Sequence, residues 1–236
     1  FTLFLVNEMN VPCLYISADS DAATQISRLA AMVTGEDSRN VRRNLEVAPD
    51  YYAEQLAGSQ IHFSFDSNPD YYDIEEEIDA WVELFDTYPE VIVVDNLRNV
   101  FSGQESEHLG YKTIQQKLID VSRETHACVI TMHHMSESFG DSKTPSPRAK
   151  VDGKVNQLPD LIFSVARDDT DFYLSVVKDR NAKDYPEADR YHTLRIDAAH
   201  GTFTRVESLQ ARANTLGAEI GTDWTGPRYE QEHFDE

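Results

Sequence analysis

Val91-Ile-Val-Val-Asp95 is the stretch that decides the fold, with four β-branched residues in succession followed by a carboxylate. A short apolar run of this kind indicates a strand buried on both faces, as strands in parallel sheets are. Val11-Pro-Cys-Leu-Tyr-Ile16 and Ala127-Cys-Val-Ile-Thr-Met132 have the same character, and Ile61-His-Phe-Ser-Phe65 is a shorter alternating strand. These runs predict the first four strands of the protein.

Helical periodicity separates the strands. Apolar residues recur at helical spacing from Ile26 to Val33, between Asp21, which can cap a helix, and Gly35, which can end one. The sequence predicts further helices over residues 38–58, broken near Pro49, over residues 74–85 after Asn68-Pro69, and over residues 111–121. Strands that alternate with helices favour a mostly parallel sheet with helices on its faces.

Three closely spaced strands are predicted near the end of the chain, over residues 161–165, 172–177 and 191–196. Short connectors between strands favour antiparallel pairing. We therefore predict an α/β fold, with a mostly parallel central sheet flanked by helices and an antiparallel C-terminal extension, over residues 1–206. Residues 207–236 are expected to form a C-terminal helix and an acidic, loosely ordered tail.

Composition restricts the function classes. The chain has 236 residues, of which 40% are hydrophobic and 27% charged, as in a folded globular protein, and no apolar run approaches the roughly 20 residues that cross a bilayer. Cys13 and Cys128 lie in predicted strands, so we expect buried free thiols and a cytoplasmic protein. The net charge of −21 argues against nonspecific binding to nucleic acid, so any contact with DNA requires a local basic patch.

Carboxylates follow two of the predicted strands. Ligands of open α/β sheets bind beyond the carboxyl ends of the strands. Asp95 ends a Walker B pattern, whose carboxylate can hold a Mg²⁺ ion that bridges nucleotide phosphates, although a strand-end Asp can also simply cap a turn. Asp19 can orient the water that attacks a phosphate, or it can belong to a polar loop before the helix-capping Asp21.

Imidazoles and cations follow two later strands. The His133-His134 pair can contact a γ-phosphate, and the alternatives are a zinc site without partners at ligand spacing or a solvated loop. Lys178 and Arg180 stand two residues apart at a strand end, so their side chains point the same way. They can neutralise a transferring phosphoryl group, or they can form an ordinary basic turn.

A basic stretch lies between the predicted strands at residues 127–132 and 161–165. Residues 136–153 are rich in Ser, Pro, Gly and Lys and predict a long mobile loop. Lys143, Arg148, Lys150 and Lys154 lie in this stretch or just after it. A mobile basic loop on an acidic protein suits a phosphate backbone, and the alternative is a solvated loop.

The order of these features resembles the DnaB-type replicative helicase domain, a branch of the RecA-like P-loop ATPases, over roughly residues 1–206. Phage-encoded members are the most similar. Ser17-Ala-Asp19 matches the Ser-x-Glu-like motif, with Asp in place of Glu, and Val91–Asp95 followed by Asn96 matches the Walker B strand. Ile130-Thr-Met-His-His134 matches the sensor strand, and Lys178-Asp-Arg180-Asn matches the Lys-x-Arg-Asn motif.

The resemblance implies a role for each matched residue. Asp19 would be the catalytic carboxylate, Asp95 and Asn96 would bind ATP and Mg²⁺, and His134 would sense the γ-phosphate. Lys178 and Arg180 would reach the ATP site of a neighbouring subunit. The loops after Asn96 and after His134 fall where the family binds DNA.

The resemblance also implies a biological setting. The protein would be a ring, a hexamer, that translocates on single-stranded DNA in a bacterial cytoplasm, encoded by a phage, with a primase or a helicase loader as a further partner and no membrane. One alternative is a recombinase or a KaiC/RadA-like DNA-dependent ATPase without unwinding activity. Another is a non-catalytic assembly or loader subunit with the same fold.

One family motif is missing from the chain. No G-x-x-x-x-G-K-[ST] occurs in the 236 residues, and this loop supplies the amides and the lysine that hold nucleotide phosphates. Phe1–Asn10 resembles the helix that follows the loop in the family. We therefore expect the loop immediately ahead of Phe1 in a longer protein, and we expect the chain as given to bind ATP poorly or not at all.

Overall fold

The computed structural model describes residue 6, residues 9–135 and residues 143–205, apart from the side chains of Lys154 and Arg205. The chain divides into two units, Phe1–Thr204 and Arg205–Glu236. Nearly all of the second unit lies outside the described residues, as does most of the helix expected over Phe1–Asn10. The C-terminal helix and tail, and the boundary at residue 206, therefore stay predictions.

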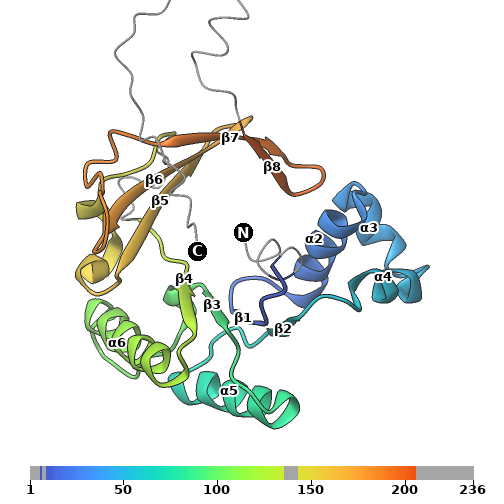
Figure 1. Ribbon diagram of the computed structural model, residues 1–236, viewed down its shortest axis with the longest axis horizontal. Coiled ribbons are helices and arrows are strands. Elements are labelled where there is room, and N and C mark those ends of the chain that lie inside the picture. Colours follow the sequence, from blue (N-terminus) through green and yellow to red (C-terminus); the bar gives the residue numbers. More distant parts are fainter. Residues whose placement is uncertain (1–5, 7–8, 136–142, 206–236) are drawn as a thin grey trace, which may run out of the picture. The chain divides into compact units, whose positions relative to one another are not determined.

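The predicted parallel sheet is confirmed. Strands β1 (Cys13–Ser17), β2 (Ile61–Ser64), β3 (Val91–Asp95) and β4 (Cys128–Thr131) pair in the order β2-β1-β3-β4, and every pair is parallel (Figure 1). β3 lies between β1 and β4, which explains why its first four residues are all buried. The register places Ser17 beside Asp95, so the strand ends with candidate side chains lie together.

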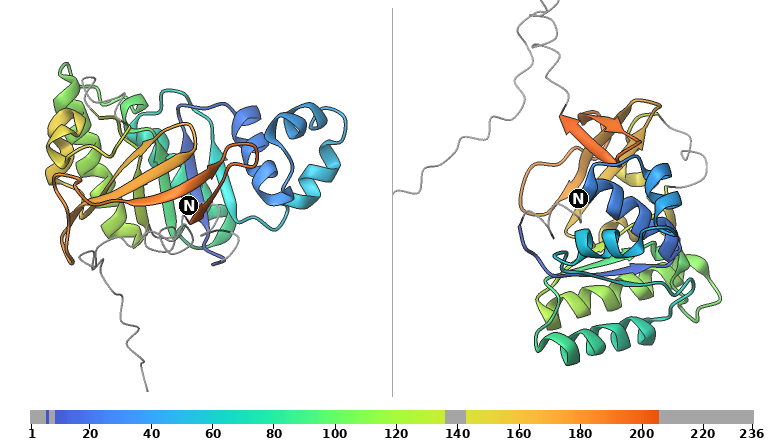
Figure 2. Two further views of the ribbon diagram at one scale, coloured as in Figure 1. Left: turned by 90° about the horizontal axis from the view of Figure 1, so that it is seen from above. Right: turned by 90° about the vertical axis from the view of Figure 1, so that its right-hand side faces the viewer.

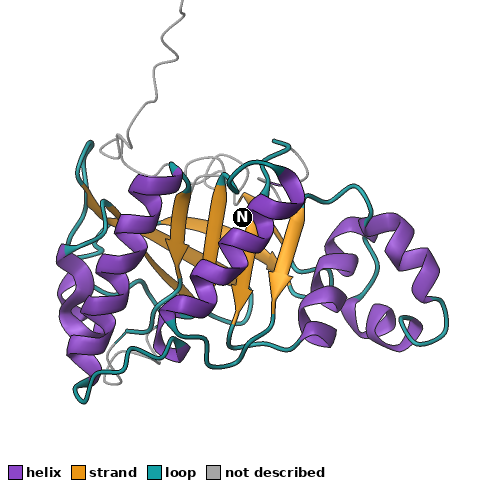
Figure 3. Cartoon of the chain, turned by 90° about the horizontal axis from the view of Figure 1, so that it is seen from below, coloured by secondary structure: helices purple, strands orange, loops and turns teal. Residues whose placement is uncertain are grey.

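Two helices, α5 (Tyr71–Phe85) and α6 (Glu107–Thr125), cover one face of this sheet (Figure 3). The Asp70 side chain caps α5, and the Asp73 carboxylate accepts the backbone N–H of Asp70, which completes a capping box. The buried side chains between the helices and the sheet include Leu14, Ile16, Ile74, Ile78, Trp81, Ile92, Val94, Ile114 and Leu118. Each fully buried aliphatic side chain contributes about 1.5–3 kcal/mol, so this layer fixes the strands that carry the candidate residues.

The helices between β1 and β2 have a core of their own. α2 (Ala22–Thr34) begins at its predicted cap Asp21 and ends at Gly35, whose φ of 71° is left-handed. α3 (Ser38–Asn44) and α4 (Pro49–Leu56) follow, separated just before Pro49 as predicted. Their buried contacts with α2 join Ala30, Ala31, Val41 and Tyr52.

The predicted antiparallel strands are also confirmed, and they form a sheet of their own (Figure 2). β5 (Leu161–Arg167), β6 (Asp171–Asp179), β7 (His192–Asp197) and β8 (Thr202–Arg205) pair in sequence order. β8 was not predicted, because Thr202-Phe-Thr-Arg205 is too short and polar to stand out in the sequence. The connection from β5 to β6 is a tight turn, in which the Asp168 carboxylate accepts the backbone N–H groups of Thr170 and Asp171.

The long mobile loop predicted over residues 136–153 is wrong for its second half. Residues 136–142 lie outside the described residues. Two short 3₁₀ helices follow, η3 (Arg148–Lys150) and η4 (Asp152–Gln157), and Val151 forms an isolated bridge with Met135. Val155 is buried in the main core against α6. The burial of Val155 could not be predicted from a Ser- and Pro-rich stretch, because a single buried valine leaves no periodic pattern in the sequence.

The two cysteines have different surroundings. Cys13 is a buried free thiol as predicted, and its burial raises the pKa to about 12. Cys128 is also free but exposed, which corrects the prediction. β4 is the last strand of the parallel sheet among the described residues, so its outer side is uncovered there. Among the described helices, none has the length and apolar character needed to cross a membrane.

Candidate functional site

The carboxyl ends of β1 and β3 are joined by backbone hydrogen bonds. The N–H groups of Ala18 and Asp19 both donate to the carbonyl oxygen of Asp95, at 2.7 and 3.1 Å. The Asn99 carboxamide donates to the carbonyl of Ala18 at 3.2 Å. These bonds place the backbones of the two candidate carboxylates, Asp19 and Asp95, side by side. The Asp19 side chain is exposed.

The Asp95 carboxylate is oriented by a tyrosine. The Tyr15 hydroxyl, on β1, donates to Asp95 Oδ2 at 2.7 Å. Burial of Tyr15, together with this bond and the neighbouring charge of Asp95, raises the pKa of the phenol well above its usual value. The phenol therefore stays a donor, and no hydrogen bond occupies Asp95 Oδ1 within the described residues. Sequence reasoning missed Tyr15, although its place two residues before the end of the adjacent strand is a usable signal.

Asn96 and His134 connect the ends of β3 and β4. Asn96 is buried, and its Oδ1 accepts the backbone N–H of Arg98 at 2.9 Å. Its Nδ2 therefore faces His134 Nε2, at 3.4 Å, as the donor. Asn96 Nδ2 donates to His134 only in the tautomer that leaves Nε2 without a proton. The backbone N–H of Leu97 donates to the Met132 carbonyl at 2.9 Å and holds the two strand ends together.

The neighbouring His133 has a different environment. Its Nε2–H donates to the Asp152 carbonyl at 3.0 Å, and its ring packs edge-on against Tyr111 at 4.9 Å between centroids. Its buried Nδ1 has no partner among the described residues. Burial lowers the pKa of His133, so it stays neutral. His133 therefore anchors η4, and His134 is the member of the pair that contacts Asn96.

Lys178 and Arg180 point the same way, as predicted, but toward their own chain. Lys178 Nζ donates to the carbonyls of Asn156 and Gln157, at 3.1 and 2.8 Å. Arg180 donates to the Leu158 carbonyl at 3.1 Å and forms an ion pair with Asp160 at 2.5 Å. Partial burial, followed by the nearby cations Arg180 and Arg148, lowers the pKa of Lys178. Within the described residues, no hydrogen bond or ion pair links these two cations to Asp19, Asp95 or His134.

The basic residues of the stretch have different surroundings. Lys143 is exposed. Arg148 lies near Lys178 and pairs with Asp184 at 3.6 Å, while its carbonyl accepts the side chain of Asn156. Lys150 is half-buried, and the side chain of Lys154 is outside the description. The structure thus groups Arg148 with Lys178 and Arg180, which the sequence did not predict.

The donor set of this edge suits a magnesium–nucleotide complex. No group of three or more His, Cys, Asp or Glu side chains in the described part of the chain is placed to hold a metal ion. Mg²⁺ is commonly bound through one or two carboxylates, together with waters and substrate phosphates. Asp95, with one oxygen held by Tyr15 and the other without a hydrogen bond, fits that pattern.

Comparison with known proteins places the chain in a family. The AAA domain model matches residues 2–138. The gene 65 protein of Mycobacterium phage L5 is 31% identical over a 207-residue alignment, which covers 82% of this chain and 76% of that protein. The gene 65 protein of Mycobacterium phage D29 is 31% identical over a 206-residue alignment, which covers 82% of this chain and 88% of that protein.

Solved structures share the fold. One solved ATPase domain superposes with a TM-score of 0.72 at 14% identity, over 87% of this chain and 80% of that one. A DnaB-like replicative helicase, described with its interactions with primase, superposes with a TM-score of 0.71 at 14% identity. That match covers 85% of this chain and about half, 53%, of the helicase. The chain therefore belongs to the AAA domain family, is related to the gene 65 proteins of two mycobacteriophages, and has the RecA-like fold of DnaB-like helicase ATPase domains.

Proposed function

We propose that this chain is the core of an ATP-dependent DNA helicase that translocates on single-stranded DNA during replication. One observation carries the proposal. Asp19, the pair Asp95-Asn96, and His134 come from three separate stretches of sequence and follow β1, β3 and β4, whose carboxyl ends are joined by hydrogen bonds. In an open α/β sheet this edge is where ligands bind. The shared fold of helicase ATPase domains supports the same interpretation.

Each residue of this edge has a proposed task. Asp95 would hold Mg²⁺, which, when bound, neutralises charge on the phosphoryl oxygens. Tyr15 keeps the Asp95 carboxylate in one orientation. Asp19 would orient the attacking water, and its exposed carboxylate is free to approach it. His134 would contact the γ-phosphate and transmit its presence to β3 through Asn96.

Lys178 and Arg180 are proposed to serve the nucleotide of a neighbouring copy in a ring, a hexamer. Their donors point together and now bind backbone carbonyls and the Asp160 carboxylate. Phosphate oxygens are stronger acceptors for such cations than carbonyls are. A nucleotide on the next copy would therefore compete for these donors.

DNA is proposed to contact the basic stretch of Lys143, Arg148, Lys150 and Lys154. The net charge of −21 makes a local cationic segment necessary for any contact with a phosphate backbone. Because Arg148 lies beside Lys178, DNA bound to Arg148 would change the electrostatic surroundings of Lys178 at the proposed ring interface. A primase or a helicase loader is the further partner that this role implies, in a bacterial cytoplasm during phage replication.

The test measures ATP hydrolysis with and without single-stranded DNA, and unwinding of a forked duplex. It requires a chain with a phosphate-binding loop, since the 236 residues contain none. We expect hydrolysis that single-stranded DNA stimulates, together with unwinding. Asp95→Asn should abolish both, whereas Asp79→Asn, an exposed carboxylate on α5, should leave both intact.

Two other results would assign a different function. Hydrolysis that depends on DNA but never unwinds the fork would indicate a recombinase or a RadA-like ATPase. Absence of hydrolysis would indicate an assembly or loader subunit that keeps the fold. Either result contradicts the helicase proposal.

A further inference from the structure

The basic residues of the first 97 positions are concentrated in one place. This stretch contains 19 acidic side chains, no lysine and only four arginines, and all four arginines lie between Arg28 and Arg43. Three of them, Arg39, Arg42 and Arg43, are on the short helix α3. Like charges on neighbouring turns of a helix repel one another, so an anionic partner would stabilise the cluster.

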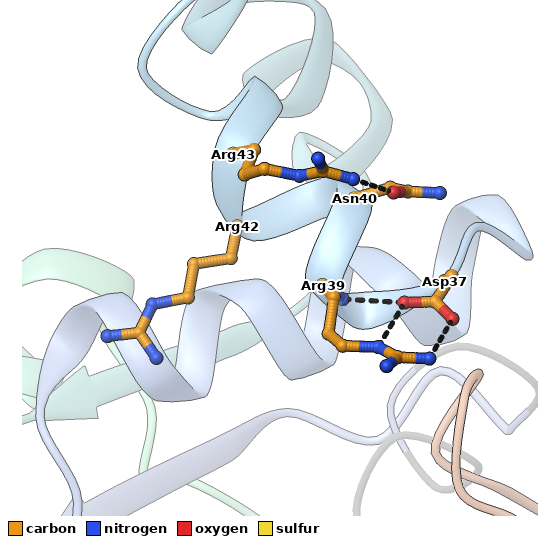
Figure 4. Close-up of a pocket in the computed structure, with 5 residues that line it drawn as sticks. All are labelled: Asp37, Arg39, Asn40, Arg42 and Arg43. Carbon is orange, nitrogen blue, oxygen red and sulfur yellow. Dashed lines mark hydrogen bonds and ion pairs between the residues drawn. The ribbon is translucent and has the colours of Figure 1, made fainter.

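These three arginines line a hollow. With Asp37 and Asn40 they enclose about 510 Å³ of space on the surface of α3 (Figure 4). Arg39 pairs with Asp37 at 3.3 Å, and Arg43 hydrogen-bonds the Asn40 side chain. The Arg42 guanidinium has no hydrogen bond or ion pair among the described residues, and Figure 4 shows it reaching away from the other two arginines. The arginine hollow therefore has donors to offer to an external anion.

A second hollow has the opposite charge. It encloses about 320 Å³ between the end of β2 and α5, and its lining includes Asp66, Asp73, Glu76 and Glu77. Asp66 and Asp73 accept backbone N–H groups of their own chain. Glu77 faces only His62, at 4.0 Å, and Glu76 has no hydrogen bond or ion pair in the described part of the protein. The acidic hollow therefore presents two available carboxylates.

We propose that the arginine hollow of one copy of this chain docks on the acidic hollow of a second copy. Guanidinium and carboxylate groups match as bidentate donors and acceptors, which favours arginine–glutamate pairs at such a contact. A contact that joins the arginine hollow of one copy to the acidic hollow of the next, and uses one hollow of each, is head-to-tail and leaves each copy one hollow for a further neighbour. Contacts of this type build rings or filaments.

A second copy fits the arginine hollow better than a nucleic acid does. The 19 acidic residues of this half of the chain oppose the approach of a polyanion such as DNA. A second copy supplies a compact acidic hollow of comparable size instead. The contact would also offset part of the repulsion between chains that each carry a net charge of −21.

The test measures association of the 236-residue chain, without ATP or DNA, by sedimentation velocity at about 20 mM and about 300 mM NaCl. The choice of a second copy rests on the ring assembly proposed above, but the readout does not involve catalysis. We expect association at low salt that weakens at high salt. General repulsion between chains of the same charge predicts the opposite salt dependence, since salt would screen it.

Charge reversal separates the proposal from general repulsion. Arg42→Glu/Arg43→Glu and Glu76→Arg/Glu77→Arg should each weaken self-association by roughly tenfold or more. The second variant makes the chain less negative, so a general charge effect would strengthen its association. An equimolar mixture of the two variants should associate again, because each then meets a complementary hollow. Arg123→Glu on α6, a matched reversal at an exposed site, should behave like the unmodified chain.

Several outcomes overturn the proposal. These are the absence of salt-weakened association, reversal variants that associate normally, and a mixture that fails to recover. If the reversal at α3 weakened binding of a single-stranded oligonucleotide and left association unchanged, the arginine hollow would be a phosphate site instead. Should a reversal variant fail to fold by circular dichroism, Arg42→Ala/Arg43→Ala and Glu76→Ala/Glu77→Ala give the same comparison.

Discussion

At the scale of single residues, the strand-end carboxylate is held by a neutral hydroxyl. The bond from Tyr15 to Asp95 Oδ2 is short, and it joins two strands that already pair in register. A lysine or arginine in that place would compete with a metal ion for the carboxylate. A phenol orients Asp95 without neutralising it, which leaves the full negative charge for a cation.

Tyr15→Phe removes this hydroxyl without changing the packing of the ring. The Asp95 oxygen then loses a hydrogen bond in a half-buried place, so we expect the free energy of unfolding to fall by about 1–2 kcal/mol. Urea denaturation measures the change. Tyr72→Phe, on an exposed tyrosine, is the control. Equal stability of the two variants would mean that the bond contributes nothing.

His133 predicts a pH dependence of stability. Its native pKa lies below the usual 6.5 because the ring is buried. The unfolded chain takes up a proton near the usual value, where the native ring stays neutral. Above pH 6.5 the ring is neutral in both states, so His133 does not lower the free energy of unfolding. As the pH falls below 6.5 this free energy declines, until the native ring also takes up a proton.

The matched change is His133→Gln, which keeps an N–H donor for the Asp152 carbonyl but cannot titrate. Between pH 7 and pH 5 we expect the unmodified chain to lose more stability than this variant, as measured by urea midpoints. His108→Gln, on an exposed histidine, should leave the slope as it is. The idea fails if both variants follow the unmodified slope.

At the scale of elements, η4 links two candidate regions. Its Asp152 carbonyl accepts His133, which follows β4, and the carbonyls of Asn156 and Gln157 accept Lys178, at the end of β6. Its Val155 is buried against α6. A movement at the end of β4 would therefore pass through η4 to the cations of β6.

Gly153 is the point where this link is most sensitive. Its φ is +65°, and an added Cβ would lie 2.5 Å from the Tyr111 ring. Gly153→Ala should therefore destabilise the protein by about 2 kcal/mol, from the left-handed backbone and the forced shift of Tyr111. Gly58→Ala, where an added Cβ meets nothing within 4 Å, should be close to neutral in the same thermal melts. Similar melting temperatures for both would show that η4 adapts freely.

The elements also show what a sequence can predict. The four residues before Asp95 are all apolar and β-branched. Both the burial of this strand and the position of a carboxylate at its end could therefore be predicted. The position of Tyr15 near the end of the adjacent strand was a signal, but its bond to Asp95 and the carbonyl partners of Lys178 depend on register and on contacts between distant segments. Cys128 was misplaced for a similar reason, since an apolar strand does not reveal that it lies at the end of a sheet. The position of Arg148, apart from the other basic residues of the stretch, likewise depends on its ion pair with Asp184, which lies 36 positions further along the chain.

At the scale of the whole molecule, the candidate residues form two separate groups. Asp19, Asp95, Asn96 and His134 lie at the edge of the parallel sheet, while Lys178 and Arg180 follow β6 in the antiparallel sheet. In the described residues no hydrogen bond or ion pair joins the groups. Under the proposed function, one complete nucleotide site therefore takes two copies, each contributing a different group.

Mixing two inactive variants tests this requirement most directly, in a chain that carries a phosphate-binding loop. Asp95→Asn disables the first group and Arg180→Ala the second, so each variant alone should hydrolyse ATP at background rates. In a mixture, some interfaces pair an intact Asp95 with an intact Arg180 from the neighbouring copy. We predict that the mixture recovers a clear fraction of DNA-stimulated hydrolysis, highest near equal proportions. Background hydrolysis at every ratio would contradict a site shared between copies.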